Sequence, residues 1–164
     1  MLENIGEGEM KLEQVQIKYL KETPTNARIH SKEQIDMLVD SMKAFGFTAP
    51  VLATKDNVIM AGHARVKAAK RAGIKKVPVI RFDFDEITAR AYTIADNRHA
   101  ENADVDLPKL KDELEYLDTF NIPMTAIGYT QKDLEDLMTQ IHQPEEEKTE
   151  QEIKCPECGA VFTR

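Results

Sequence analysis

A glycine, a histidine and an arginine stand together where a short apolar run gives way to an expected helix. Gly62, His63 and Arg65 follow the run 58–61 (VIMA). The first turn of a helix has unpaired N–H groups and a partial positive charge, and a glycine at its entry lets a ligand approach the backbone. With an added arginine, these residue types predict a site for an anion, above all phosphate. An ordinary strand-turn-helix with a solvated basic face is the alternative.

Basic residues without nearby acids continue beyond this point. From His63 to Lys76 there is no Asp or Glu, and six residues are Lys or Arg: Arg65, Lys67, Lys70, Arg71, Lys75 and Lys76. The chain of 164 residues carries a formal net charge of −7, so this basic island is local. The net charge argues against broad, nonspecific coating of DNA, but it is compatible with a focused basic patch.

The two cysteines form a second candidate site, in the sequence Cys155-Pro-Glu-Cys158-Gly. A Cys-x-x-Cys-Gly turn presents two thiolates to one metal ion, and the segment resembles one zinc knuckle. Zinc takes four ligands; His142, 13 residues before Cys155, is one candidate, and two chains could alternatively pool their cysteine pairs in a dimer. A degenerate zinc ribbon or a free, reducible cysteine pair is the alternative.

The pattern of apolar residues indicates which elements position these side chains. Alternation predicts a strand at 13–20, and Ser31 with Gln34 has the spacing of a helix N-cap. The buried stripe of that helix is expected to be Ile35, Leu38, Val39 and Met42, with Gly46 at its end. Strands are expected at 50–54, 58–61 and 76–82, and the basic helix at 63–72. Pro78 suggests that the strand 76–82 lies at an edge or that Pro78 starts it.

The second half of the chain reads as helical. A long helix is expected at 86–101, followed by a leucine-rich helix and a last helix capped by Thr130. The resulting organisation is a tail (1–12), a phosphate-binding domain (13–104), a helical subdomain (105–142), an acidic linker (143–153) and the cysteine knuckle (154–164). Because the chain has neither an apolar run of membrane-spanning length nor a signal-like N-terminus, we expect a cytoplasmic protein with no membrane partner.

Four short motifs, in order, resemble the ParB-like N-terminal domain of the ParB/sulfiredoxin superfamily. They are 24–28 (PTNAR), 46–51 (GFTAPV), 59–65 (IMAGHAR) and 94–98 (IADNR). The variant 95–102 (ADNRHAEN) is most similar to ParB-like domains found in phages and beside DNA methyltransferases. The resemblance implies an α+β fold with a small mixed sheet and helices, followed here by a helical subdomain and the zinc-knuckle-like tail.

The resemblance also implies a nucleotide site at the matching positions. Gly62 and Arg65 would cradle phosphates, and Asp96 and Asn97 would approach both the phosphates and a magnesium ion, which prefers oxygen ligands. The cofactor would then be Mg²⁺ with CTP or ATP, besides Zn²⁺ at the cysteines. Further contacts to phosphate, or to the base or sugar, are assigned to His63, Arg98, Arg28 and Thr48.

Several positions depart from the family pattern. His63 and Ala64 stand where partition proteins have Glu and Arg, so one phosphate contact is missing, and Arg98 follows the Asn directly. Sulfiredoxins have their catalytic cysteine at the position of His63, so sulfinic acid reduction is not expected.

Three functions follow from these features. The first is a nucleotide-binding regulatory module, in which the nucleotide changes homodimerisation or DNA binding. The second is a magnesium-dependent enzyme, such as a ParB-like nuclease, an NTPase or a phosphotransferase, with Glu101, Asp96 or His63 as its base. The third is a DNA-associated adaptor that recruits a methyltransferase or another phage protein.

Overall fold

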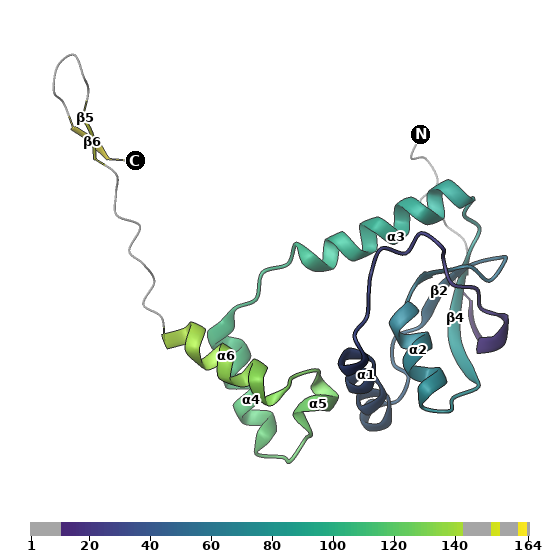
Figure 1. The fold of residues 1–164 in the computed structure, drawn as a ribbon, viewed down its shortest axis with the longest axis horizontal. Coiled ribbons are helices and arrows are strands. Elements are labelled where there is room, and N and C mark those ends of the chain that lie inside the picture. The colour runs from purple at the N-terminus through teal and green to yellow at the C-terminus, as the bar shows by residue number, and fades with distance from the viewer. Residues whose placement is uncertain (1–10, 143–151, 155–160, 164) are drawn as a thin grey trace.

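The computed structural model describes residues 11–142, 152–154 and 161–163, and it has the predicted α+β architecture (Figure 1). The elements are, in chain order, β1 (Leu12–Gln16), the 3-10 helix η1 (Ile17–Tyr19), α1 (Lys32–Phe45), β2 (Val51–Thr54), β3 (Ile59–Ala61), α2 (His63–Arg71), β4 (Lys76–Phe82), α3 (Glu86–Glu101), α4 (Leu107–Asp118), α5 (Met124–Ile127), α6 (Gln131–His142), β5 (Glu152–Lys154) and β6 (Val161–Thr163). The predicted strand 13–20 is therefore shorter, because its second half turns into η1.

The first four strands form one sheet in the order β1-β4-β2-β3. β4 runs antiparallel to β1 and parallel to β2, while β2 and β3 form an antiparallel pair. A parallel pair needs a crossover connection, and here β3 and α2 supply it. Alternate residues of β2 and β4, including Val51 and Val79, pack against Val66 and Ala69 of α2 to form the main core. This packing fixes the start of α2 beside the end of β3.

The helix α1 packs beside α2 on one side of the sheet (Figure 1). Ile35 and Val39 of α1 are buried against Ala68 of α2, with Leu38 and Met42 at the edge of the contact, as the predicted stripe requires. The Ser31 hydroxyl accepts a hydrogen bond from the Gln34 amide at 3.0 Å, which confirms the N-cap. Gly46 follows the helix.

Pro78 corrects one sequence prediction, since β4 is a central strand and Pro78 is its third residue. Pro78 pairs with Gln14 of β1 on one side, but the register with β2 begins only at Val79. At Pro78 the strand therefore has a hydrogen-bonding neighbour on one side alone. A residue without an N–H is tolerated there for the same reason that it is tolerated at a true edge.

The long helix α3 has the predicted bounds, and the Asp85 side chain caps it by accepting from the Thr88 amide at 2.7 Å. The helix contacts β3 and continues beyond the sheet (Figure 1). Its Thr93 is buried, whereas Ile87 and Ile94 are largely exposed. One side of α3 thus closes the end of the sheet from which α2 begins.

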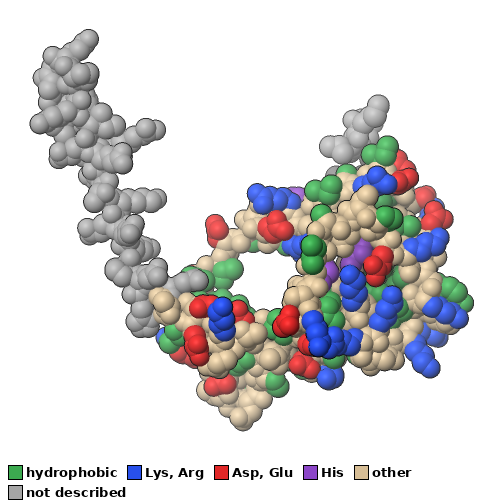
Figure 2. Space-filling model, in the orientation of Figure 1, with side chains coloured by type: hydrophobic (Ala, Val, Ile, Leu, Met, Phe, Trp, Pro, Cys, Tyr) green, Lys and Arg blue, Asp and Glu red, His purple; other side chains and the backbone are tan. Residues whose placement is uncertain are grey.

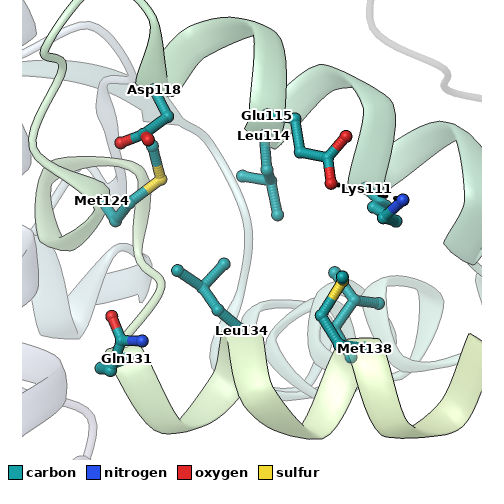
Figure 3. Close-up of a pocket in the computed structure, with 9 residues that line it drawn as sticks. Lys111, Leu114, Glu115, Asp118, Met124, Gln131, Leu134 and Met138 are labelled. Carbon is teal, nitrogen blue, oxygen red and sulfur yellow. Dashed lines mark ion pairs between the residues drawn. The ribbon is translucent and has the colours of Figure 1, made fainter.

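Three further helices form the helical subdomain. Leu114 of α4 and Leu134 of α6 point toward each other across a cavity of about 310 Å³, which Met124 and Met138 also line (Figure 3). The short helix α5, which the sequence pattern does not predict, contacts α1. The Thr130 hydroxyl accepts from the Asp133 amide at 3.2 Å, so the predicted cap of α6 is confirmed.

The C-terminal segment is described in part. β5 and β6 pair antiparallel, with Ile153 opposite Phe162. The predicted linker 143–153 lies almost wholly outside the described residues, as do both proposed zinc ligands, Cys155 and Cys158. Of the helices in the described ranges, none has the length and apolar character that a bilayer span requires.

Candidate functional site

The entry to α2 has a backbone geometry that favours glycine. Gly62 has φ +97°, in the region that side-chain-bearing residues rarely adopt, and it is the N-cap of α2. A Cβ at this position would lie 3.4 Å from Nε of Arg65 and 3.5 Å from Cα of Val51. The absence of a side chain leaves the first turn of α2 open at its N-terminal end.

A cavity of about 240 Å³ lies at this point and combines most of the predicted phosphate residues. Its lining includes six of them: Arg28, Gly62, His63, Arg65, Asp96 and Asn97. They come from the loop before α1, from the start of α2 and from α3. Residues 65 and 96, far apart in the sequence, are therefore brought to one hollow that contains both cations and a carboxylate.

Arg65 has a structural task in addition to lining the cavity. Its Nη1 donates to the carbonyl oxygens of Ala49 at 2.7 Å and Pro50 at 2.9 Å. Partial burial lowers the pKa of the guanidinium, and the negative charge of Asp96 opposes this effect. At neutral pH Arg65 remains a cation, held in place by the loop that leads into β2.

His63 is buried, with 7% of its surface exposed, and it lines the same cavity. Within the described residues its Nε2 atom has no hydrogen-bond partner. Burial lowers the pKa of His63 most, Lys67 and His30 lower it further, and Glu22 raises it. The ring is therefore neutral at pH 7, and one of its nitrogens is left for a ligand.

The loop before α1 reaches α3 through Arg28. Its Nη2 donates to the backbone oxygen of Asn97 at 3.3 Å and to the Glu101 carboxylate at 3.2 Å. The hydroxyl of Thr23, at the start of this loop, donates to the carbonyl oxygen of Ile59 on β3. These contacts close the loop over the cavity.

Arg98 and Glu101 line a different cavity, of about 470 Å³, on the other side of Arg28 and Asn97. Arg98 and Glu101 lie two and five residues beyond Asp96 on α3, so they are on a different side of the helix from Asp96. The two side chains form an ion pair with each other. Thr48 is exposed and is absent from the lining of the cavity at Gly62. These three predicted residues therefore lie outside the lining of the cavity at Gly62, although Glu101 contacts Arg28.

Three polar residues of the cavity were not predicted, namely Asn26, His30 and Gln34. The His30 ring lies 2.9 Å from the Gln34 side-chain oxygen, and His30 is half-buried. The sequence pattern indicates Gln34 only as a residue at capping distance from Ser31. Its second role depends on how the loop folds back, which no local pattern shows.

Two side chains of the cavity offer oxygen ligands for magnesium, which is fewer than its full shell requires. Asp96 offers a carboxylate and Asn97 an amide oxygen, the donor types that Mg²⁺ takes. Among the described residues there is no group of three or more His, Cys, Asp or Glu that could hold a metal ion. A magnesium ion here would need oxygen atoms from a phosphate and from water to complete its shell.

Comparisons with known proteins agree with this geometry. A model of the ParB N-terminal domain matches residues 3–98. The chain is 53% identical over 55 residues to the ParB-like nuclease domain-containing protein YnaK of Escherichia coli, covering 34% of this chain and 63% of that protein. It is 32% identical over 74 residues to a probable chromosome-partitioning protein ParB of Campylobacter jejuni, covering 43% of this chain and 27% of that protein. The matches thus span less than two thirds of either relative.

Among solved structures, the chain is similar to the C-terminally truncated chromosome-partitioning protein ParB of Caulobacter crescentus complexed with CTP-γ-S. The TM-score is 0.67 at 23% sequence identity, with 83% of this chain and 81% of that chain covered. This likeness shows a shared fold.

Proposed function

The chain belongs to the ParB N-terminal domain family, and from this membership and the cavity at Gly62 we propose that it binds the phosphate groups of a magnesium nucleotide at the start of α2. The observation that carries the proposal is that an open helix N-terminus, Arg28, Arg65 and Asp96 line one cavity. Helix amides and guanidinium groups bind phosphate oxygens, and the carboxylate supplies an oxygen for a cation that accompanies them.

The size of the cavity limits which part of the nucleotide it encloses. A volume of about 240 Å³ is below the ~300–1,000 Å³ usual for whole small-molecule sites. The phosphates would fill this cavity, and the sugar and base would lie outside it. CTP is the first nucleotide to test, because a protein of the same fold was solved with CTP-γ-S, and ATP is the second.

The chain's own residues supply the selectivity of this site. Gly62 lets phosphate oxygens approach the backbone, while the hydrogen bonds from Arg65 to Ala49 and Pro50 hold its guanidinium beside that point. Asp96 and Asn97 would hold magnesium, which neutralises phosphate charge when bound. His63 is neutral and offers a single hydrogen bond through Nε2, instead of a second cation.

The biological context that we propose is a DNA-linked process, such as partition or modification of phage or mobile-element DNA. This context is supported by the similarity of the chain to proteins that are named as chromosome-partitioning proteins. A homodimer and a methyltransferase or other phage protein as partner belong to the same proposal. Hydrolysis of the nucleotide, or cleavage of nucleic acid, would be a further property of the same cavity.

Thermal-shift titration of the full chain with CTP, ATP, GTP and UTP, each with Mg²⁺, tests the proposal. A ligand at 100 times its Kd stabilises the native state by about 2.7 kcal/mol, which raises Tm by several degrees. Arg28→Gln should reduce this rise, and Arg98→Gln should retain it, since Arg98 carries the same charge on the other side of Asn97. No shift with any of the four nucleotides would refute the proposal.

A further inference from the structure

The cavity of about 310 Å³ in the helical subdomain is a groove between two helix faces. α4 and α6 run in opposite directions along it, since Lys111 and Met138 lie at one end and Asp118 and Gln131 at the other (Figure 3). The lining residues of α4 lie at i, i+3, i+4 and i+7, which is the spacing of one helix face. This face is about 10 Å long, so the groove follows the helices for about two turns.

The floor of the groove is apolar and partly open to solvent. Leu114 and Leu137 are buried, with 5% and 7% of their surfaces exposed, whereas Met138 is 39% exposed. Leu134 and Met124 are half-buried. Methionine side chains are flexible and fill irregular spaces, so the two methionines allow the groove to adjust to an apolar ligand.

The groove lies where a third long helix would complete the subdomain. The apolar stripe of a helix has to be buried against another element, and helical units do this by packing several helices around one core. All lining residues of the groove come from α4, α5 and α6. Because α5 has only four residues, contacts α1 and reaches the groove through Met124 alone, the side between α4 and α6 stays open.

The charge around the groove decides between possible occupants. From Leu107 to His142 the sequence has seven Asp or Glu residues and three Lys residues. Figure 2 shows Asp and Glu side chains over this subdomain, at the lower left, whereas Lys and Arg side chains gather around α2 and β4. A second copy of the subdomain, or a nucleic acid, would bring more negative charge to the groove and would be repelled.

The edge of the groove is acidic in the same sense. Glu115 and Asp118 stand on the α4 side, and both are exposed. Lys111 pairs with Glu115 at 3.3 Å, so one positive charge faces two carboxylates. An apolar floor with an acidic edge is complementary to a ligand that has an apolar side and a basic side.

We propose that the groove between α4 and α6 binds a basic amphipathic helix of a partner protein. The apolar residues of that helix, spaced i, i+3 or i+4, and i+7, lie on Leu114, Leu134 and Met138, as in other helix-in-groove complexes. Its Lys or Arg residues lie beside Glu115 and Asp118. The groove shares no residue with the cavity at Gly62, so the inference does not depend on the proposed nucleotide site.

Fluorescence anisotropy of the full chain with synthetic 14-residue peptides tests the proposal. The probe peptide contains leucine and lysine, with its leucines on one face of a helix. One comparison peptide has the same composition with the leucines spread around the helix, and the other has glutamate in place of lysine. The probe should bind at least about tenfold more tightly than either comparison peptide.

Leu134→Ala/Met138→Ala should weaken binding of the probe by about tenfold or more, because both side chains line the groove. The matched control is Tyr116→Ala/Phe120→Ala. It removes two side chains of the same subdomain that are 60% and 59% exposed and lie outside the groove lining. The control should bind the probe like the wild type, and both variants should keep the wild-type far-UV circular dichroism.

A second pair of variants changes only exposed carboxylates. Glu115→Gln/Asp118→Asn should weaken binding of the probe and reduce its dependence on salt, because it neutralises the edge of the groove. Asp112→Asn/Glu113→Gln removes the same charge from α4 outside the groove lining and should have a smaller effect on both. These surface changes test the proposal even if the alanine variant is poorly folded.

Binding of the probe that both groove variants weaken more than their controls supports the proposal. Equal binding of the two leucine-lysine peptides, equal losses in groove and control variants, or no binding at high micromolar peptide would overturn it. A dimer in sedimentation that Leu134→Ala/Met138→Ala abolishes would also overturn it, because a second copy would then occupy the groove. The groove variants should keep the thermal shift with Mg²⁺ and nucleotide, so the two proposals can fail separately.

Discussion

The Arg28 guanidinium binds the Glu101 carboxylate at 3.2 Å, although 73 residues separate the two in the chain. The same Nη2 atom donates to the backbone oxygen of Asn97. This contact ties the loop before α1 to the end of α3 and forms the wall between two cavities. Arg28 is proposed to bind phosphate, and the Glu101 carboxylate therefore competes with the phosphate for the same guanidinium.

Glu101→Gln should tighten nucleotide binding by up to about fivefold, equivalent to about 1 kcal/mol, because Arg28 is then free to contact phosphate. Both side chains are about half exposed, so the stability lost should be less than about 1 kcal/mol. Isothermal titration measures the affinity, with Glu135→Gln on α6 as the control for the change in charge. Unchanged or weaker binding would show that Glu101 does not compete for Arg28.

Arg65→Ala should reduce the free energy of unfolding by about 1–3 kcal/mol, because it removes two charge-assisted hydrogen bonds to the carbonyls of Ala49 and Pro50. Urea unfolding with and without nucleotide separates this loss from any effect on binding. Arg98→Ala, a more exposed arginine, should change stability by less than about 0.5 kcal/mol. Equal stability of both variants would contradict the structural role given to Arg65.

Gly62→Ala and Gly73→Ala form a matched pair. Both glycines have positive φ, so alanine should cost about 1–2 kcal/mol of stability at either position. A Cβ at Gly73 would meet nothing within 4 Å, whereas one at Gly62 would meet the buried Val51 and Arg65, which lines the cavity. Only Gly62→Ala should lose nucleotide affinity, measured by titration calorimetry; equal affinity of the two variants would argue against phosphate contact at Gly62.

His63 should make the protein less stable as pH falls. Its folded-state pKa is lowered, chiefly by burial, so between that pKa and the unfolded value of about 6.5 the unfolded chain binds more protons. Stability therefore decreases on acidification through this window. The drop in Tm from pH 7.5 to 5.5 should be smaller in His63→Gln, with His30→Gln as the control for the neighbouring ring. Equal drops in the wild type and His63→Gln would contradict this account.

Local patterns were sufficient where local physics decides the structure. The bounds of α3, the caps at Ser31 and Thr130 and the stripe of α1 follow from spacing and capping chemistry, and the structure confirms them. The prediction that Pro78 marks an edge strand or a strand start was wrong. β2 begins beside Val79, so Pro78 has no partner on that side although β4 is a central strand. That stagger is a tertiary feature, which alternation cannot show.

The candidate site was predictable only where a motif lies at one helix end. Gly62, His63 and Arg65 fall together because α2 starts there, and Asp96 joins them through the family pattern. The separation of Arg98 and Glu101 depends on the rotation of α3 against β3, and His30 enters the cavity through the path of a loop. The bonds from Arg65 to the 46–50 loop likewise required the folded chain.

The backbone amide signals of Gly62, His63 and Ala64, followed by ¹H–¹⁵N NMR during titration with Mg²⁺ and CTP, test the central claim most directly. Phosphate bound at the start of α2 should shift these three signals along one saturable curve, with the same apparent Kd as the Arg28 side chain. Gly73 and the amides of α4 should not move. Saturable shifts confined to other residues, or no shifts at millimolar CTP and ATP, would contradict the account.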